Sequence, residues 1–397
     1  MSRTETVAPP QQQLRPRSRG DRRPQRTRLD DFPRDPLRRW LLRVVFALPF
    51  LAAAILSSFH PSGVSVNGGL LEHVAQIPWG SGDAAWIGEV FPPISTAIAV
   101  VTPGGRLGLS IIGAVAAGIV LQKVVEILVQ RRVPLSTTAL LVIALGLNPL
   151  FFYTALENLP AFLGLSFFGL ALADIVRFVS WGSTQSGFRA GLFLMLATMT
   201  DPSAGLYVVA AVVAASFLRL SRTGQRGARL ANTLVIAFPA AAAMGSVWLL
   251  GVMFLREPLG LAATDAFPGG HFGLDSLVGV FQTPYGGLLL ASVATAWLMS
   301  LVLRRPGGII VATLAFAAVM VGFVLGLVPP ESSGNTFMMM TMLCIALIPT
   351  ARVPGATRLV GLVAVVQIVI AWIAVIDRPA AADWLTTLIG AAGSLVG

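Results

Sequence analysis

The sequence has few charged side chains for its length. Asp, Glu, Lys and Arg make up only 12% of its 397 residues, while 55% of the residues are hydrophobic. Soluble globular proteins carry about 25% charged residues, so this chain lacks the polar side chains that would cover a water-facing globule. The composition excludes a conventional soluble enzyme and a disordered protein, and it predicts an all-α polytopic membrane protein.

Cysteine and histidine are also scarce. The single cysteine, Cys344, lies in an apolar run and has no partner for an internal disulfide. The three histidines, His60, His73 and His271, are far apart and show no HExxH or CxxC spacing. We therefore expect no metal site and no cofactor. The sequence also has no phosphate-cradling P-loop pattern, which argues against ATP-driven transport by this chain alone.

The positive charge is concentrated at the N-terminus. The first 43 residues hold twelve of the 28 Lys and Arg residues and five acids, so they supply +7 of the net charge of +10. Residues 1–36 are rich in Arg, Pro, Gln and Ser, which predicts a disordered cytoplasmic tail ahead of a transmembrane domain at 37–397. The tail fits a topology anchor or an arm for anionic lipid. It has no aromatic residue in its first thirty positions for stacking on bases, so we expect no nucleic-acid partner.

Long apolar runs predict the membrane spans, each of which needs about 20 residues. Two shorter runs, 189–199 and 203–219, are split by Thr200-Asp201-Pro202, and we expect them to form a re-entrant pair that returns to the side it left. Together the runs predict about 9–11 transmembrane helices. The longer runs cover residues 40–58, 107–130, 134–155, 159–178, 230–255, 284–303, 308–328, 336–352 and 358–376.

The loop charges predict the orientation. If the N-terminus is cytoplasmic and the spans alternate, the basic loops fall inside and the acidic loops outside, as the positive-inside rule requires. The bases that remain outside are Arg106, Arg256 and Arg378. We therefore expect a multi-pass plasma-membrane protein whose acidic loops are extracytoplasmic.

Two outer loops are long enough to form a site, at about 59–106 and 256–283. In the first, residues 70–77 have apolar side chains at helical spacing, which predicts a helix lying along the membrane interface. Glu72 and His73 fall on the wet side of this helix. Because binding and catalytic residues concentrate in loops, we expect function in these two loops and in the membrane cavity beneath them.

Four short segments show a family resemblance. They are residues 91–94 (Phe-Pro-Pro-Ile), which lead into a span, 147–150 (Leu-Asn-Pro-Leu), 157–158 (Glu-Asn) and 197–202 (Ala-Thr-Met-Thr-Asp-Pro). Their order along the chain, after a first span and an outer loop with an interfacial helix, resembles the GT-C glycosyltransferases over about residues 40–220. Those are integral membrane enzymes that take a sugar from a polyprenyl-phosphate donor.

The resemblance implies an acidic residue, often Asp-Glu, in the first outer loop, which acts as base or positions the acceptor hydroxyl. The corresponding position here is Asn67-Gly68, and an asparagine cannot accept a proton. Glu72, Asp83 and Glu89 lie in the same loop and are the catalytic candidates, each as a base for the acceptor hydroxyl. The alternative interpretation of each is a solvated loop acid.

Four further residues are candidates for substrate binding. Arg106 and Arg256 can hold a lipid phosphate by bidentate contact, or they can be snorkelling side chains at the interface. His271, in a Gly-rich loop, fits a proton shuttle or phosphate partner, or is simply exposed. Asp201 is a carboxylate expected at membrane depth, where such a residue marks a functional site, although it can also cap the following helix.

Two charge pairs near the inner ends of spans have i, i+3 spacing. These are Lys123 with Glu126 and Asp174 with Arg177. At this spacing the side chains share one face of a helix, so we expect each pair to neutralise itself and not to form a transport relay.

Three functions remain open. The first is a GT-C-like glycosyltransferase that moves a sugar from a polyprenyl-phosphate donor to an extracytoplasmic cell-envelope acceptor, with membrane lipids and the lipid-linked sugar as partners. The second is a catalytically degenerate relative that acts as scaffold or partner subunit of an envelope-assembly complex, which Asn67-Gly68 favours. The third is a transporter of a lipid-linked substrate, against which the sequence shows no paired repeats with matched broken helices.

Overall fold

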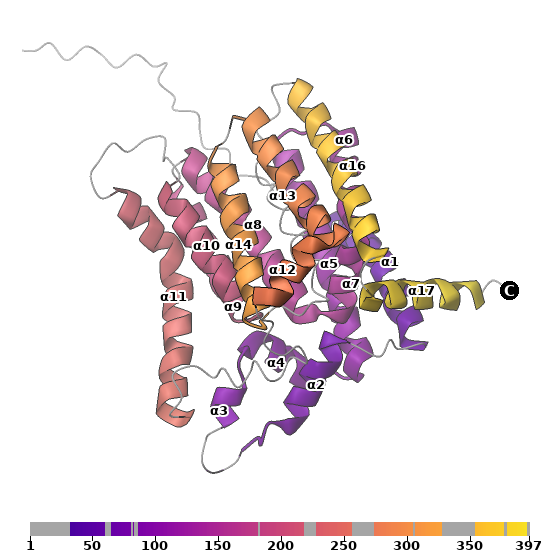
Figure 1. Ribbon diagram of the computed structural model, residues 1–397, viewed down its shortest axis with the longest axis vertical. Coiled ribbons are helices and arrows are strands. Elements are labelled where there is room, and N and C mark those ends of the chain that lie inside the picture. The colour runs from indigo at the N-terminus through magenta and orange to yellow at the C-terminus, as the bar shows by residue number, and fades with distance from the viewer. Residues whose placement is uncertain are drawn as a thin grey trace, which may run out of the picture.

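The structure, a computed structural model, describes residues 32–59, 65–80, 82, 86–181, 183–217, 228–255, 274–304, 306–327, 354–376 and 379–394. All regular secondary structure in these ranges is α-helical (Figure 1). The helices are α1 (Pro36–Phe59), α2 (Val66–Gln76), α3 (Trp86–Glu89), α4 (Pro93–Val101), α5 (Gly105–Gln130), α6 (Leu135–Gly146), α7 (Pro149–Glu157), α8 (Leu159–Trp181), α9 (Thr184–Thr198), α10 (Ala204–Phe217), α11 (Ala228–Leu255), α12 (Leu274–Gln282), α13 (Pro284–Val302), α14 (Gly307–Val324), α16 (Pro354–Ile376) and α17 (Pro379–Ser394).

Seven of these helices are long and apolar enough to cross a membrane, namely α1, α5, α8, α11, α13, α14 and α16. They correspond to seven of the spans predicted from the sequence. The predicted span at 336–352 lies outside the described residues, as does Cys344. The protein is therefore an all-α, multi-pass membrane protein, with seven candidate spans in the part of the chain that is described, or eight if the bent pair α6–α7 forms one span.

The bundle has two distinct ends. We call the end where α1 begins and α5 finishes the tail end, and the opposite end, which carries α2, α3 and α4, the loop end (Figure 1). At the tail end, Arg43 of α1 donates to Gln122 of α5 at 3.1 Å. Residues 32–35, placed by sequence in the tail, already pack there, since the carbonyl oxygen of Phe32 accepts a hydrogen bond from Gln122 at 2.7 Å. Residues just before the first span are thus part of the packed structure.

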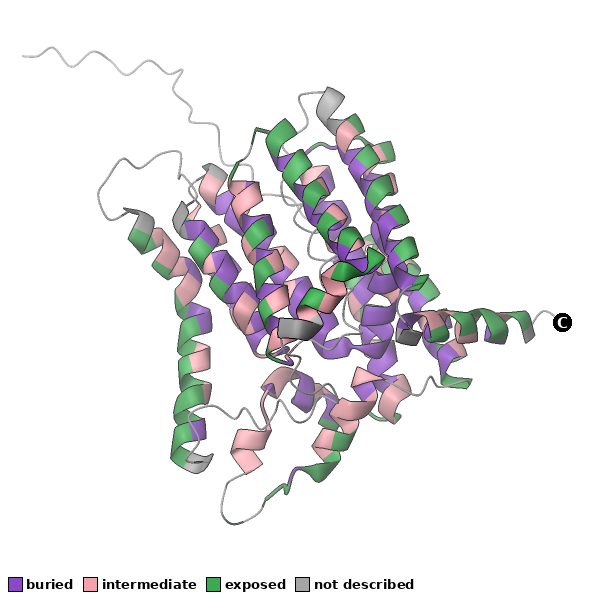
Figure 2. Cartoon of the chain, in the orientation of Figure 1, coloured by how far each residue is buried: buried purple, intermediate pink, exposed green. Residues whose placement is uncertain are grey.

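The centre of the bundle consists of α5 and α8. In these helices 67% and 72% of the apolar window is buried inside the protein, against 28% in α1 and 22% in α11, whose outer faces are left for lipid (Figure 2). Glycines let neighbours approach α5 closely. A Cβ on Gly113 would lie 1.8 Å from the carbonyl oxygen of Ala155 in α7, and one on Gly118 would lie 2.5 Å from that of Arg43 in α1. The packing of the core therefore requires these small residues.

The predicted span at 134–155 is broken in the structure into α6 and α7, which are bent by 55° relative to each other. Asn148 causes the break. Its side-chain oxygen accepts hydrogen bonds from the backbone N–H groups of Leu150 at 2.9 Å and Phe151 at 3.2 Å, while Pro149 occupies the first turn of α7. An Asn cap followed by Pro is a strong start signal for a new helix.

The predicted break at Thr200-Asp201-Pro202 is present. Helix α9 ends at Thr198 and α10 begins at Ala204. Arg189 of α9 contacts Asp174 near the tail end of α8, whereas Met199 contacts α4 at the loop end. The chain therefore runs from the tail end to the loop end in α9 and returns in α10, as expected for a hairpin that comes back to the side it left.

Candidate functional site

The loop end contains the first group of polar residues that the sequence singled out. The predicted interfacial helix is α2, which begins at Val66, four residues earlier than the apolar pattern indicates. Ser65 caps it, accepting a hydrogen bond from the backbone N–H of Gly68 at 3.4 Å. Helix α2 packs on α4, α5 and α8, so it covers the loop ends of the central helices. Helix α2 therefore closes the bundle at the loop end.

Asn67, at the position where the resemblance implies an acid, is fully buried. Its side-chain nitrogen donates to the carbonyl oxygen of Leu156 at 2.8 Å, and its side-chain oxygen accepts from the backbone N–H of Leu159 at 2.8 Å. These two backbone groups flank the junction between α7 and α8, where the helical hydrogen bonds are interrupted. Asn67 thus ties α2 to that junction and uses both ends of its amide to do so.

Arg106 and Glu157 form a buried ion pair next to Asn67. A terminal nitrogen of Arg106 lies 2.9 Å from Glu157 Oε2, and the side chains are 27% and 2% exposed. Ser65 Oγ donates to the same carboxylate oxygen at 2.7 Å. The carboxylate of Glu157 is therefore held by α5 and by the cap of α2, and its burial makes the pairing cation necessary.

Helix α4 packs on α2 and also contacts the break between α9 and α10. The backbone N–H of Ile94 donates to the carbonyl oxygen of Met199 at 2.9 Å, and Ser95 Oγ donates to that of Thr200 at 2.9 Å. The Phe-Pro-Pro-Ile segment at 91–94 is thus in direct contact with the break, although about a hundred residues separate them in the chain.

Asp201 lies in this break and is 4% exposed. Its carboxylate accepts hydrogen bonds from the backbone N–H of Ser203 at 3.0 Å and from Ser203 Oγ at 2.7 Å. A Cβ on Gly164 of α8 would lie 2.8 Å from the Cβ of Asp201. A glycine at this position of α8 therefore leaves the space that the aspartate occupies. Asp201 therefore caps the turn that leads into α10, and its acidic group is almost completely removed from solvent.

The acids of the first outer loop lie apart from this buried group. Glu72 is exposed on α2, and Glu89 is the last residue of α3. His73 links the two helices, because its Nε2 lies 2.9 Å from the carbonyl oxygen of Glu89. The predicted residues Asp83, Arg256 and His271 lie outside the described residues. Among the described residues, no group of three or more His, Cys, Asp or Glu side chains could hold a metal ion.

The loop end therefore combines a cation and two buried carboxylates with loop acids around them. Arg106 is partly exposed and carries the positive charge that a lipid phosphate needs. Glu157 is paired with that cation, whereas Glu72 is exposed and so open to a substrate from the outer side. The described loop end thus holds a partly exposed cation that is already paired with a buried carboxylate, and an exposed carboxylate on α2.

Comparisons with known proteins add no family to this picture. No family model, no curated protein and no solved structure matches the chain. The functional argument therefore depends on the residues and their geometry.

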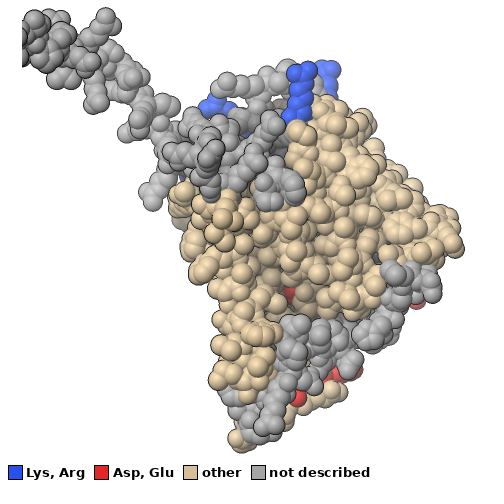
Figure 3. Space-filling model, turned by 60° about the vertical axis from the view of Figure 1, so that its left-hand side comes forward, with Lys and Arg blue, Asp and Glu red and all other residues tan. Residues whose placement is uncertain are grey.

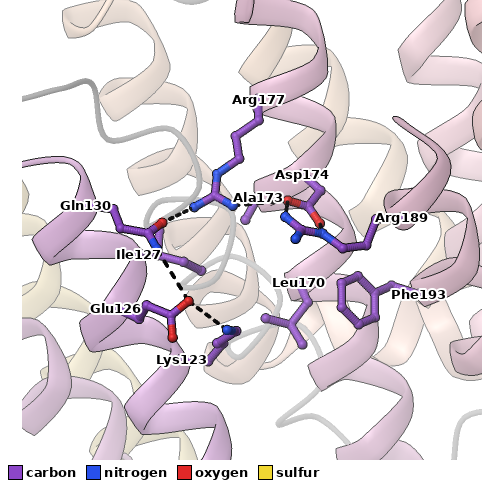
Figure 4. Close-up of a pocket in the computed structure, with 10 residues that line it drawn as sticks. All are labelled: Lys123, Glu126, Ile127, Gln130, Leu170, Ala173, Asp174, Arg177, Arg189 and Phe193. Atoms are coloured by element: carbon purple, nitrogen blue, oxygen red, sulfur yellow. Dashed lines mark hydrogen bonds and ion pairs between the residues drawn. The ribbon is translucent and has the colours of Figure 1, made fainter. Parts of the chain in front are cut away.

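Sequence reasoning missed a second polar cluster, at the tail end. A cavity of about 210 Å³ lies between α5, α8 and α9 (Figure 4). The predicted pairs are present, with Lys123 2.7 Å from Glu126 and Arg177 3.4 Å from Asp174. What the sequence did not show is that α9 brings Arg189 to Asp174 at 2.5 Å. The polar residues of this tail-end pocket are Lys123, Glu126, Gln130, Asp174, Arg177 and Arg189.

Proposed function

We propose that the protein is a GT-C-like glycosyltransferase, which moves a sugar from a polyprenyl-phosphate donor to a cell-envelope acceptor at the loop end. One observation carries the proposal: two of the segments on which the resemblance depends are in contact at this end, and a third lies beside the position where the resemblance implies an acid. Residues 91–94 contact the break at 199–203, and Asn67 of α2 bonds to the junction that contains residues 157–158.

The proposed reaction is an in-line displacement at the anomeric carbon. The acceptor oxygen forms a bond to this carbon while the bond to the donor phosphate breaks, and the phosphate leaves with the electron pair. A carboxylate of the first outer loop takes the proton of the acceptor hydroxyl, for which Glu72, Asp83 and Glu89 are the candidates. Arg106 is the candidate for stabilising the negative charge of the phosphate, which would then share its guanidinium with Glu157. Since the phosphate leaves unprotonated, one base and one region of positive charge are sufficient.

We place the loop end outside the cytoplasm and the protein in the plasma membrane. The described loop end holds Glu72 and Glu89, whereas Arg132 and Arg304 lie just after α5 and α13 at the tail end and Arg358 lies near the start of α16 there. Figure 3 shows Lys and Arg side chains at one end of the molecule and Asp and Glu side chains toward the other. The positive-inside rule associates such basic loops with the cytoplasm. A lipid-linked sugar would then reach the site from the outer leaflet.

The test is sugar transfer by the purified full chain from radiolabelled polyprenyl-phosphate donors to an envelope extract. We expect at least one of the variants Glu72→Gln, Asp83→Asn and Glu89→Gln to lose about 100-fold or more, because a general base contributes about 10²–10⁴-fold. Asp383→Asn, an exposed carboxylate on α17, is the matched control. Full activity in all three variants would show that the proposed base is not among these residues.

The structure of Asn67 favours a second candidate function, a degenerate relative that acts as scaffold of an envelope-assembly complex. Its amide is committed to holding α2 on the α7–α8 junction, so the position at which the resemblance implies an acid serves packing here. The two functions differ in a complementation experiment. A triple variant without Glu72, Asp83 and Glu89 restores the envelope of a deletion strain if the protein is a scaffold, and fails to do so if these acids catalyse transfer.

A further inference from the structure

The charges of the tail-end pocket do not balance. Lys123 and Glu126 form one pair, at 2.7 Å, which is neutral. Asp174 is shared by two cations, since Arg189 lies 2.5 Å and Arg177 3.4 Å from its carboxylate oxygens. Among the described residues, the lining therefore holds three bases and two acids, and the excess positive charge lies in the group formed by Asp174, Arg177 and Arg189.

This excess charge is located where water screens it poorly. The side chains of Asp174 and Arg177 are only 4% and 10% exposed. Arg177 also donates to Gln130 at 2.5 Å, so its guanidinium is held in place between α5 and α8 (Figure 4). A buried cation without a compensating anion is unfavourable because it loses hydration. An anion in the cavity would offset that loss for both arginines.

Arg189 and Lys123 are placed to receive such an anion. Both line the cavity, and their side chains are 47% and 37% exposed, far more than that of Arg177. Arg189 binds Asp174 through its Nε and one terminal nitrogen, at 2.5 Å each. A guanidinium presents five donors in a rigid fork, which suits the oxygens of phosphate as well as those of a carboxylate.

The shape of the pocket indicates what kind of anion fits. Leu170 lies seven residues before Arg177 on α8, which is about 10 Å deeper in the bundle. Phe193 lines the pocket one turn deeper than Arg189 on α9 (Figure 4). Lys123 lies about two turns before the end of α5, at a depth similar to that of Leu170, so the cavity is charged at both levels and Leu170 and Phe193 form its apolar part (Figure 4). Its volume of about 210 Å³ is several times the ~30 Å³ that a water molecule occupies, and smaller than the about 300–1,000 Å³ of pockets for drug-sized ligands.

We propose that the tail-end pocket is a binding site for a phosphate group, with Arg189 and Lys123 as its direct contacts and Arg177 as a fixed source of positive potential. The phosphate belongs either to a lipid headgroup, whose chain would lie against Leu170 and Phe193, or to a free phosphate ion. The site is at the opposite end of the bundle from the proposed transferase site. It therefore does not depend on that function, and each can fail without the other.

Binding to the purified full chain in neutral detergent tests the proposal. The probes are short-chain phosphatidic acid, short-chain phosphatidylcholine and inorganic phosphate, followed by calorimetry and by the shift in melting temperature. If the site takes a lipid, phosphatidic acid binds and inorganic phosphate does not. If it takes the phosphate group alone, both bind. Binding of neither, or equal binding of phosphatidic acid and phosphatidylcholine, would overturn the proposal.

Variants separate this site from the basic tail, which also attracts anionic headgroups. We expect Arg189→Gln and Lys123→Gln each to weaken phosphate binding about tenfold, since a charge-assisted hydrogen bond contributes roughly this much. Arg189→Lys keeps the charge and should retain most of the affinity, which covers the case that Arg189→Gln does not fold. Arg38→Gln is the control, because Arg38 is exposed at the same end and pairs with Asp35 outside the pocket. Wild-type affinity in both glutamine variants would refute the site.

Discussion

Asn67 occupies the position at which the resemblance implies an acid, and its hydrogen bonds explain why an acid would not fit there. The amide nitrogen donates to the carbonyl oxygen of Leu156, and only the amide oxygen accepts, from the N–H of Leu159. An aspartate carboxylate has no donor, so it would face that carbonyl oxygen at about the same distance with like partial charges. The residue type is thus required by the junction between α7 and α8, quite apart from catalysis.

We predict that restoring the acid destabilises the protein and does not activate it. Asn67→Asp loses the bond to Leu156 and buries a charge, while Asn67→Ala leaves the N–H of Leu159 unpaired, which costs about 1–3 kcal/mol. Leu156 keeps its bond from Ser110, at 2.7 Å. Thermal unfolding in detergent measures both changes, with Gln76→Ala, an exposed site on the same helix, as the control. A gain of sugar transfer in Asn67→Asp would contradict this interpretation.

The Arg106–Glu157 pair leads to a second prediction, in which the two partners are not equivalent. Glu157 is 2% exposed and Arg106 is 27% exposed. Arg106→Gln leaves an almost fully buried carboxylate without its cation, which costs about 3–5 kcal/mol of stability. Glu157→Gln should reduce the free energy of unfolding by less, because the partly exposed guanidinium of Arg106 can be hydrated.

Denaturant titration of the two single variants and the double variant measures this difference. The exposed pair Arg38–Asp35 supplies the control, because removing a surface salt bridge costs about 1 kcal/mol or less. An equal loss of unfolding free energy in Arg106→Gln and Glu157→Gln would contradict the prediction that the more exposed partner tolerates loss of the pair better.

Among the helices, the sequence was sufficient to predict the seven described spans and the break at 200–202, but not the break between α6 and α7. The seven candidate spans are continuous apolar runs, and a run of about 20 residues has few alternatives in a membrane. The break in α6–α7 was missed because Leu147 and Leu150 continue the apolar run on either side of Asn148. Asn148-Pro149 is a helix-start signal, but it covers only two residues within an apolar run of about twenty.

The site was less predictable than the spans, for a physical reason that its residues show. The pair Lys123–Glu126 lies on one helix, so its spacing alone predicts contact. Arg106 and Glu157 are 51 residues apart, and Arg189 reaches Asp174 only because α9 folds back on α8. Contacts between helices depend on which helix faces pack together. A membrane helix is apolar on all sides, so its sequence gives little indication of which face packs against which neighbour.

The close approach of α5 to its neighbours gives a prediction at the scale of helices. In a free helix, Gly→Ala stabilises by about 0.5–1 kcal/mol. At Gly113 the added Cβ would lie 1.8 Å from the carbonyl oxygen of Ala155, so α5 and α7 must separate. We therefore expect Gly113→Ala to destabilise by about 1–3 kcal/mol or more. On α11, Gly245 has nothing within 4 Å of an added Cβ, so Gly245→Ala should be neutral or stabilising.

Thermal unfolding of both alanine variants in the same detergent makes the comparison. The two substitutions add the same methyl group to a helix, and they differ only in what that group meets. A loss of stability at Gly113 together with none at Gly245 supports the packing of α5 against α7. Similar values at the two positions would mean that this close contact is absent from the protein.

For the molecule as a whole, the separation of basic and acidic side chains between the two ends of the bundle says more about function than the net charge does. The tail end carries bases such as Arg132, Arg304 and Arg358, while the described loop end carries the acids Glu72 and Glu89. Figure 3 shows this separation of basic and acidic side chains. Both proposed sites depend on this polarity. A transferase site at the loop end needs donor lipids of the outer leaflet, whereas a phosphate site at the tail end would meet the inner leaflet and the cytoplasm.

Cysteine labelling tests this orientation directly, because the chain has one cysteine. In a Cys344→Ser background, Gln76→Cys places a thiol on the exposed face of α2 at the loop end, and Ser136→Cys places one in the exposed first turn of α6 at the tail end. A membrane-impermeant maleimide should label Gln76→Cys in intact cells and Ser136→Cys only after permeabilisation. The reverse pattern would move the loop end to the cytoplasm, where the proposed transfer to an envelope acceptor could not occur, and would turn the phosphate site toward the outer leaflet.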